Sequence, residues 1–301
     1  MQNSNNNDQN QAESGSEPVT YKRVPSVRGS AWITDAFMLF KSSIGAWLGI
    51  VTFMMLLLLI PIVNNIVSLL MPIGIGGLMI GCKQASKASP LKFEHLFSGI
   101  QNNAKELIIL SAIYGLASMA IMLISYYILL FLGVDFSEIL PENIEQMKNA
   151  ELVEWMQSLD QTKLLPMLLL GILIWMALMI PLIMAYWFAP ALVVLNKTSS
   201  LKALKLSFNA CRDNFLPFVV YGLVGFAYLM GFFIVLTISA IIPPLAIIVM
   251  IGGYLAIFAI ALASIYTSYV DIFGQQKTTS SDDQNGSDSD TNSESDSSML
   301  A

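Results

Sequence analysis

Few side chains in this sequence could do chemistry, and those that could stand outside its long apolar segments. The only histidine is His95, which follows Glu94, and a second charged pair, Arg212 and Asp213, lies much further along the chain. Catalysis on a lipid would need a nucleophile or a water molecule activated by a neighbouring base. It would therefore require Glu94, His95, Arg212 and Asp213 to converge on one pocket.

Metal and thiol chemistry have little support either. A lone histidine cannot form a metal cluster, and Cys82 and Cys211 have no histidine near them in the sequence. Both cysteines fall where we expect the cytoplasmic side of a membrane, where thiols stay reduced. We predict that the protein is not an enzyme, with no catalytic residue, no metal site and no cofactor.

Two groups of charged residues remain as candidates for a structural or lipid-binding role. Arg212, Asp213 and Asp271 end neighbouring segments, and we expect them to form an interfacial polar cluster that ties the last hairpin to the helix before it. Lys202 and Lys205 lie on a short amphipathic segment. Lysines on such a segment typically face anionic lipid headgroups.

The elements that must position these residues are six apolar segments without an ionisable residue well inside any of them. The chain has 301 residues, of which 55% are hydrophobic and 12% are charged, whereas soluble domains contain about 25% charged residues. A membrane span needs about 20 apolar residues. The segments cover about residues 43–63, 66–82, 107–132, 164–195, 215–239 and 245–270, with turns at Asn64–Asn65 and Pro243–Pro244.

The loops between these segments predict the orientation. Of the 15 Lys and Arg residues, only Lys148 and Lys163 fall outside when the N-terminus is placed inside. Lys and Arg stay on the cytoplasmic side of a membrane. We therefore predict an all-α, six-span protein of the bacterial inner membrane with both termini in the cytoplasm. The loop over 133–163 is then external, and we expect a helix after Pro141 with an acidic, solvated face that includes Glu142 and Glu145.

Three similar units can be discerned along the chain. Short amphipathic segments with aromatic residues, over 31–41, 91–97 and 201–208, each precede a pair of spans. This order predicts interfacial helices and three diverged hairpin repeats. Small-residue pairs at Gly45/Gly49 and Gly77/Gly81 would let helices approach closely, within the chain first and between copies second.

The two ends of the chain differ from the spans in composition. Residues 1–22 and 274–301 are rich in Asn, Gln and Ser, and six carboxylates and no base follow Lys277. Segments of this kind bury too little apolar surface to fold alone. We predict disordered acidic tails over 1–22 and 274–301 around a membrane domain over 23–273.

Several stretches resemble an uncharacterised family of bacterial inner-membrane proteins. They are Phe188-Ala189-Pro190-Ala191-Leu192-Val193, the segment over 200–208, Asn214-Phe215-Leu216-Pro217-Phe218 and Ser268-Tyr269-Val270-Asp271-Ile272-Phe273. The resemblance covers about residues 21–275. The pattern over 202–215 is also loosely similar to the membrane domain fused to some glycerophosphodiester phosphodiesterases. The resemblance implies a transmembrane protein and supplies no catalytic residue.

Together these features predict a non-enzymatic, membrane-organising or accessory role. The alternative is a transporter or channel for an uncharged or lipid-like small molecule, since Gly and Pro breaks can line a cavity. As partners we expect membrane lipids and either a second copy or another membrane protein, and no nucleic acid.

Overall fold

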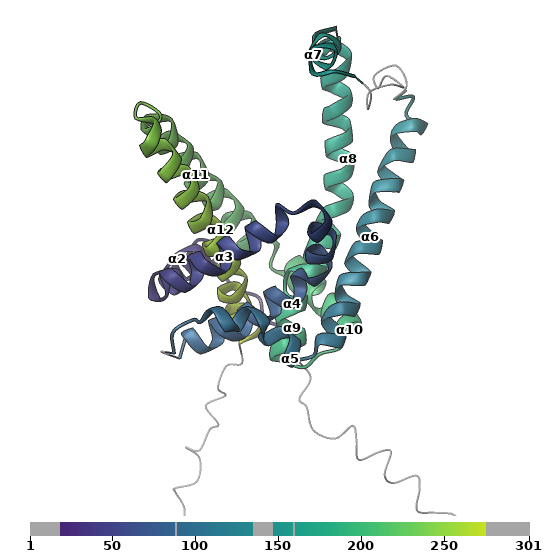
Figure 1. Cartoon of the computed structure of the whole chain (residues 1–301). Helices are drawn as coiled ribbons and strands as arrows, with labels where there is room; N and C mark the ends of the chain where they lie inside the picture. The colour runs from purple at the N-terminus through teal and green to yellow at the C-terminus, as the bar shows by residue number, and fades with distance from the viewer. Residues whose placement is uncertain (1–18, 88, 135–146, 159, 275–301) are drawn as a thin grey trace, which may run out of the picture.

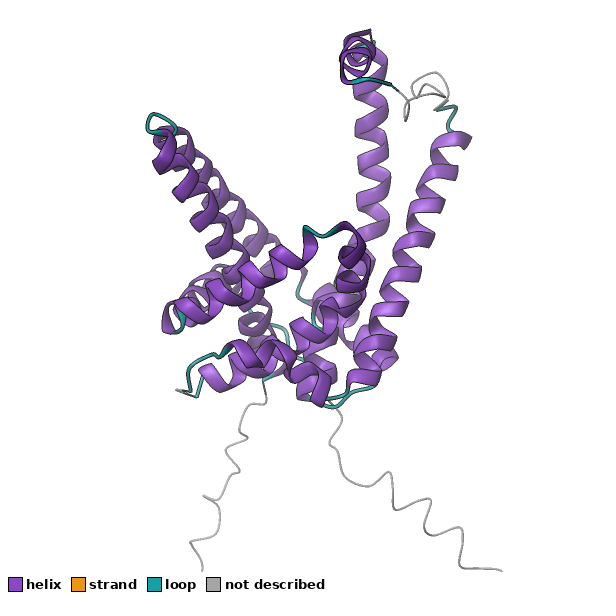
Figure 2. Ribbon diagram, in the orientation of Figure 1, coloured by secondary structure: helices purple, strands orange, loops and turns teal. Residues whose placement is uncertain are grey.

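The computed structural model describes residues 19–87, 89–134, 147–158 and 160–274, and within these ranges the regular elements are all helical (Figure 2). The predicted disordered tails lie mostly outside these ranges, as do Glu142 and Glu145. In chain order the elements are α2 (Arg28–Ser42), α3 (Ile44–Leu58), α4 (Pro61–Ala85), η1 (Phe93–Phe97), α5 (Ser98–Gln101), α6 (Ala104–Phe131), α7 (Asn149–Ser158), α8 (Gln161–Trp187), α9 (Ala189–Leu195), α10 (Ser200–Asp213), α11 (Phe215–Ser239) and α12 (Pro243–Phe273).

The long helices form hairpins that rise from a shared base. The base is the part of the protein where α2, α4, α9 and α10 pack against the near ends of the long helices. The α6/α8 and α11/α12 hairpins diverge from this base as two separate arms, and short helices gather beneath them (Figure 1). Each predicted amphipathic segment is helical, as α2, η1 and α10. The helix predicted after Pro141 is α7. An internal repeat remains a prediction.

Among the residues that the structure describes, four helical segments are long and apolar enough to cross a membrane. They are α6, α8 continued by α9, α11 and α12, and a fifth would be the α2–α3 pair if its 100° bend is counted within one span. The expected total of six is not confirmed.

The expected turn at Asn64–Asn65 is wrong. The chain breaks at Leu59–Ile60, and α4 begins at Pro61 and runs through both asparagines. Proline restricts the residue before it to extended backbone, which Ile60 adopts at φ −88° and ψ 109°, and it fits the first position of a helix. Pro61 therefore ends the first segment earlier than hydropathy alone predicts.

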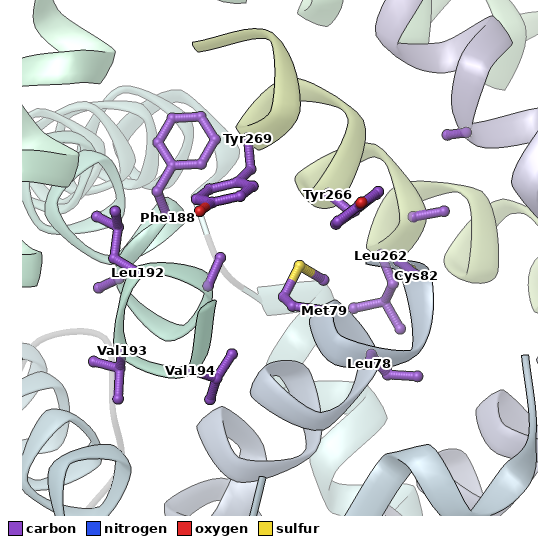
Figure 3. Packing of buried hydrophobic residues seen from close by; sticks show 14 of the residues in the cluster. Leu78, Met79, Cys82, Phe188, Leu192, Val193, Val194, Leu262, Tyr266 and Tyr269 are labelled. Atoms are coloured by element: carbon purple, nitrogen blue, oxygen red, sulfur yellow. The ribbon is translucent and has the colours of Figure 1, made fainter. Parts of the chain in front are cut away.

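The core lies in the base, where the inner parts of α4, α9 and α12 meet (Figure 3). Met79 and Cys82 of α4 pack there with Leu192 of α9 and with Leu262 and Tyr269 of α12. The core thus joins segments that are far apart in the sequence.

Glycines let helices approach closely at this base. A Cβ atom on Gly77 would lie 2.3 Å from the carbonyl oxygen of His95, and one on Gly29 would lie 2.1 Å from that of Pro217. The predicted role of Gly77/Gly81 in internal packing is confirmed, since a Cβ on Gly81 would also clash with η1. Gly45 has open space around it.

A side-chain hydroxyl explains the bend between α8 and α9. Ser207 of α10 donates a hydrogen bond to the carbonyl of Met184 at 2.7 Å and accepts one from the N–H of Phe188 at 3.0 Å. These two backbone groups would otherwise pair with each other in a continuous helix. Of the three prolines in this stretch, Pro166 and Pro181 lie inside α8, and Pro190 is at the break.

The arms bury little of their surface within the protein. In the most apolar window of each candidate span, the buried share is 17% for α6, 6% for α8–α9, 0% for α11 and 11% for α12. Most side chains in these windows are therefore not enclosed by the rest of the protein.

Candidate functional site

The N-terminal segment over 19–27, here called the strap, lies across the ends of two hairpin elements. Its Lys22 N–H donates to the carbonyl of Ile272 at 2.9 Å, at the end of α12. The buried amide of Asn214 accepts from the N–H of Val24 at 2.8 Å and donates to the carbonyl of Lys22 at 3.1 Å. Residues 19–22, which we placed in the tail, thus belong to the folded base.

Asp271 is the acceptor of a polar cluster that fixes α2 to α12. Arg28 donates from Nε at 2.6 Å and from Nη2 at 2.8 Å, and the indole Nε1 of Trp32 donates at 2.7 Å. Arg28 also reaches Asp35 at 3.2 Å. Two-point pairing of a guanidinium with a carboxylate is both strong and directional.

Asp213 forms a second cluster with the strap. The Tyr21 hydroxyl donates to it at 3.0 Å, Arg212 pairs with it at 3.2 Å and Arg23 lies 3.7 Å away. The hydrogen bond from Tyr21, reinforced by Arg212, holds the pKa of Asp213 below its ordinary value.

The predicted cluster of Arg212, Asp213 and Asp271 is therefore two clusters. The guanidinium beside Asp271 comes from Arg28, because α2 lies along α12 and brings its first residue to that carboxylate. The strap, between Tyr21 and Arg28, links the two. Sequence reasoning missed Asn214 and Trp32, although Asn214 begins one of the stretches that carried the family resemblance.

Helix α10 turns a small-residue face toward the base. Its buried residues are Ser200, Ala203, Ser207, Ala210 and Cys211. Lys202 and Lys205 are exposed, and Leu201 is 71% exposed. Leu201 therefore points outward together with the two lysines.

Burial also determines the chemistry of the cysteine on this helix. Removal from water raises the pKa of the Cys211 thiol to about 12. The thiol is protonated at neutral pH, and a protonated thiol is a poor nucleophile.

The start of α10 is anchored to the start of α6. Ser200 donates from its backbone N–H at 2.7 Å and from its hydroxyl at 2.6 Å to the carboxylate of Glu106. Asn103, in the left-handed conformation at φ 63°, donates to the carbonyl of Val193 at 3.0 Å. These contacts fix the α6/α8 arm on the base.

Both ring nitrogens of His95 form hydrogen bonds within the protein. Its Nδ1 accepts from the backbone N–H of Lys92 at 2.9 Å, so its Nε2 carries the proton and donates to Gln84 at 2.9 Å. Arg212 and Asp213 take part in the strap cluster instead. These contacts therefore do not bring His95 together with Arg212 and Asp213, as a catalytic pocket would require. Among the residues that the structure describes, no group of three metal-binding side chains is present.

Two cavities lie between the helices. One, of about 120 Å³, is surrounded by residues of α4, α6, α8, α9 and α12. The other, of about 160 Å³, lies between α3, α4 and the η1–α5 region, with Phe53, Met71 and Phe97 in its wall. Both are lined mainly by apolar side chains.

Comparison with known proteins agrees with the membrane assignment. The chain is 34% identical over 106 residues to a probable inner membrane protein of Burkholderia thailandensis. The matched stretch covers 34% of this chain and 38% of that protein. The chain thus matches well under half of the relative's length. No family model matches, and no solved structure matches. The likeness to glycerophosphodiester phosphodiesterases is not shown.

Proposed function

We propose that this protein is a non-catalytic accessory protein of the bacterial inner membrane, which organises lipid or a membrane-protein partner around its two arms. The observation that carries the proposal is the low burial of the spans, from 0% to 17% of residues in their most apolar windows. Apolar helix surfaces of this extent must be covered by acyl chains or by other helices.

The exposed side chains support this role. Leu116 and Met122 on α6 are each 70% exposed, and Leu223 on α11 and Ile248 on α12 are 65% and 68% exposed. They are large, apolar and spread along the arms. Such surfaces offer van der Waals contact and no group for acid–base work.

The base supports the same role in another way. Its ionic and amide groups are engaged in structural contacts: Asp271 joins α12 to α2, and Asn214 joins the strap to the junction of α10 and α11. A rigid base beneath separated arms suits a scaffold. Lys202 and Lys205, exposed beside Leu201, are placed to meet anionic headgroups while the leucine enters the acyl boundary.

Extraction in native-lipid particles, followed by mass spectrometry of lipids and proteins, tests the proposal. We expect anionic phospholipid or a stoichiometric membrane protein to be enriched over the bulk membrane. A lysine near an anionic surface contributes about 1 kcal/mol. The anionic lipid enriched around Lys202→Gln/Lys205→Gln should therefore fall by about fivefold or more, whereas Lys148→Gln should match the wild type.

A particle with bulk lipid composition and no bound protein would count against the proposal. So would turnover of a lipid by the purified protein. Neither result depends on whether the cavity of about 120 Å³ binds a ligand.

A further inference from the structure

The cavity of about 120 Å³ lies where both arms meet the base. Isoleucines from α4, α8 and α12 line it, together with Pro190 of α9 and the aromatic side chains of Tyr114, Tyr186 and Trp187. Tyr114 lies ten residues after Ala104, so it is about 15 Å along α6 from its start. A bilayer has a hydrocarbon core about 30 Å thick, so this depth lies within reach of lipid chains.

Two tyrosine hydroxyls at this cavity lack hydrogen-bond partners. The rings of Tyr114 and Tyr186 pack with centroids 4.4 Å apart. Within the part of the chain that the structure describes, neither hydroxyl has a protein partner, and neither is among the fully covered polar atoms. Both can therefore be reached by a ligand. The hydroxyl groups of Tyr221 and Tyr269 are paired, with Ser264 and Asn196.

A hydroxyl in hydrocarbon without a partner is costly, and an acceptor oxygen would remove that cost. Nε1 of Trp187, another lining residue of the cavity, is also buried without a partner. A hydroxyl that donates needs an acceptor, and a carbonyl oxygen is an acceptor that carries no charge.

The size of the cavity and the lack of charge in its lining narrow the class of ligand further. The lining residues of this cavity carry no ionic side chain, so a neutral group is favoured over a phosphate or a carboxylate. Cavities of about 150 Å³ hold one benzene ring. The space of about 120 Å³ is smaller than that, so it admits one edge of a ring or a few carbons of a longer molecule, whose remainder would lie in the bilayer.

We propose that this cavity binds an uncharged, carbonyl-bearing group of a membrane lipid, with the Tyr114 and Tyr186 hydroxyls as donors. Two sources share this chemistry, the ring of an isoprenoid quinone and the acyl ester of a phospholipid. The inference goes beyond the accessory role and does not require it, since a scaffold could hold its partners with this cavity unused.

Native mass spectrometry of the full-length protein in detergent, titrated with decylubiquinone or with phosphatidylethanolamine, tests the inference. Tyr114→Phe/Tyr186→Phe keeps both rings and removes both donors. Because each hydrogen bond contributes modestly, we expect the affinity for the cognate probe to fall about tenfold. Ile183→Trp should fill the cavity and abolish binding. Tyr228→Phe, at an exposed tyrosine of α11, is the matched control and should bind like the wild type.

Each outcome of this titration supports or overturns the proposal. A loss confined to decylubiquinone identifies a quinone-type ring, and a loss confined to phosphatidylethanolamine identifies an ester carbonyl. The proposal is overturned if neither probe responds to the double variant, including the case in which only the filled cavity reduces binding. Circular dichroism of each variant shows that it is folded before binding is compared.

Discussion

At the scale of single residues, the base is held by a few polar side chains with several partners each. Asp271 accepts three hydrogen bonds from α2, and Asn214 binds the strap and the carbonyl of Ala210. Such groups are costly to leave unpaired when they are partly or fully buried. The strap and α2 are therefore parts of the fold rather than additions to it.

Replacing Asp271 with Asn should destabilise the protein. The amide carries no charge and cannot accept both guanidinium bonds, so we expect a loss of about 2 kcal/mol. Thermal unfolding in detergent measures this loss. Asp35→Asn is the control, because Asp35 meets the same guanidinium at 3.2 Å from a more exposed position, and should cost under about 1 kcal/mol. Equal stability of Asp271→Asn and the wild type would contradict the role assigned to this carboxylate.

The Asp213 cluster gives the stability a dependence on pH. Its pKa is lowered from 3.8 in the folded protein, so its contribution is complete above the unfolded-state value and is lost as the pH falls through the lowered value. We expect the difference in Tm between the wild type and Asp213→Asn to be largest near pH 7 and to shrink toward pH 3. Tyr21→Phe should show part of that difference at neutral pH. A gap that stays constant with pH would exclude this linkage.

At the scale of helices, close packing depends on small residues and on one inserted hydroxyl. Gly77 to Ala would place a methyl group against the backbone of η1, and overpacking of this kind costs about 1–3 kcal/mol. Gly45→Ala, with nothing within 4 Å of its new Cβ, should be neutral or stabilising because alanine favours helix. Comparison of the two Tm values checks this. A similar fall in Tm in both variants would mean that the loss of glycine itself, rather than the space around it, lowers the stability.

The Ser207 hydroxyl bridges the break between α8 and α9. Ser207→Ala leaves the carbonyl of Met184 and the N–H of Phe188 without that bridge, and we expect a loss of about 1–3 kcal/mol. Ser118→Ala is the matched control. The Ser118 hydroxyl is buried without a partner, so its removal should leave Tm unchanged or raise it. The interpretation fails if Ser207→Ala unfolds at the wild-type temperature.

At the scale of the whole molecule, composition and hydropathy predict the helical class and four long segments, because apolar length alone determines them. The chain break before Pro61 was missed, although its signal is the proline itself. The pairing of Asp271 with Arg28 spans 243 positions, and no local pattern can indicate such a contact. The separation of the arms was not foreseen either, since hydropathy does not distinguish a helix facing lipid from one facing another helix.

This separation carries the proposed function, and photo-crosslinking in the native membrane tests it most directly. Benzoylphenylalanine would replace Leu116 on α6 or Leu223 on α11, both strongly exposed, and Leu110, fully buried on α6, as a control. We expect the two exposed positions to form adducts with lipid or with a separate protein, and position 110 to crosslink within the chain. High-yield crosslinks between the α6/α8 and α11/α12 arms would contradict the account, because the arms would then close on each other and leave no surface to organise.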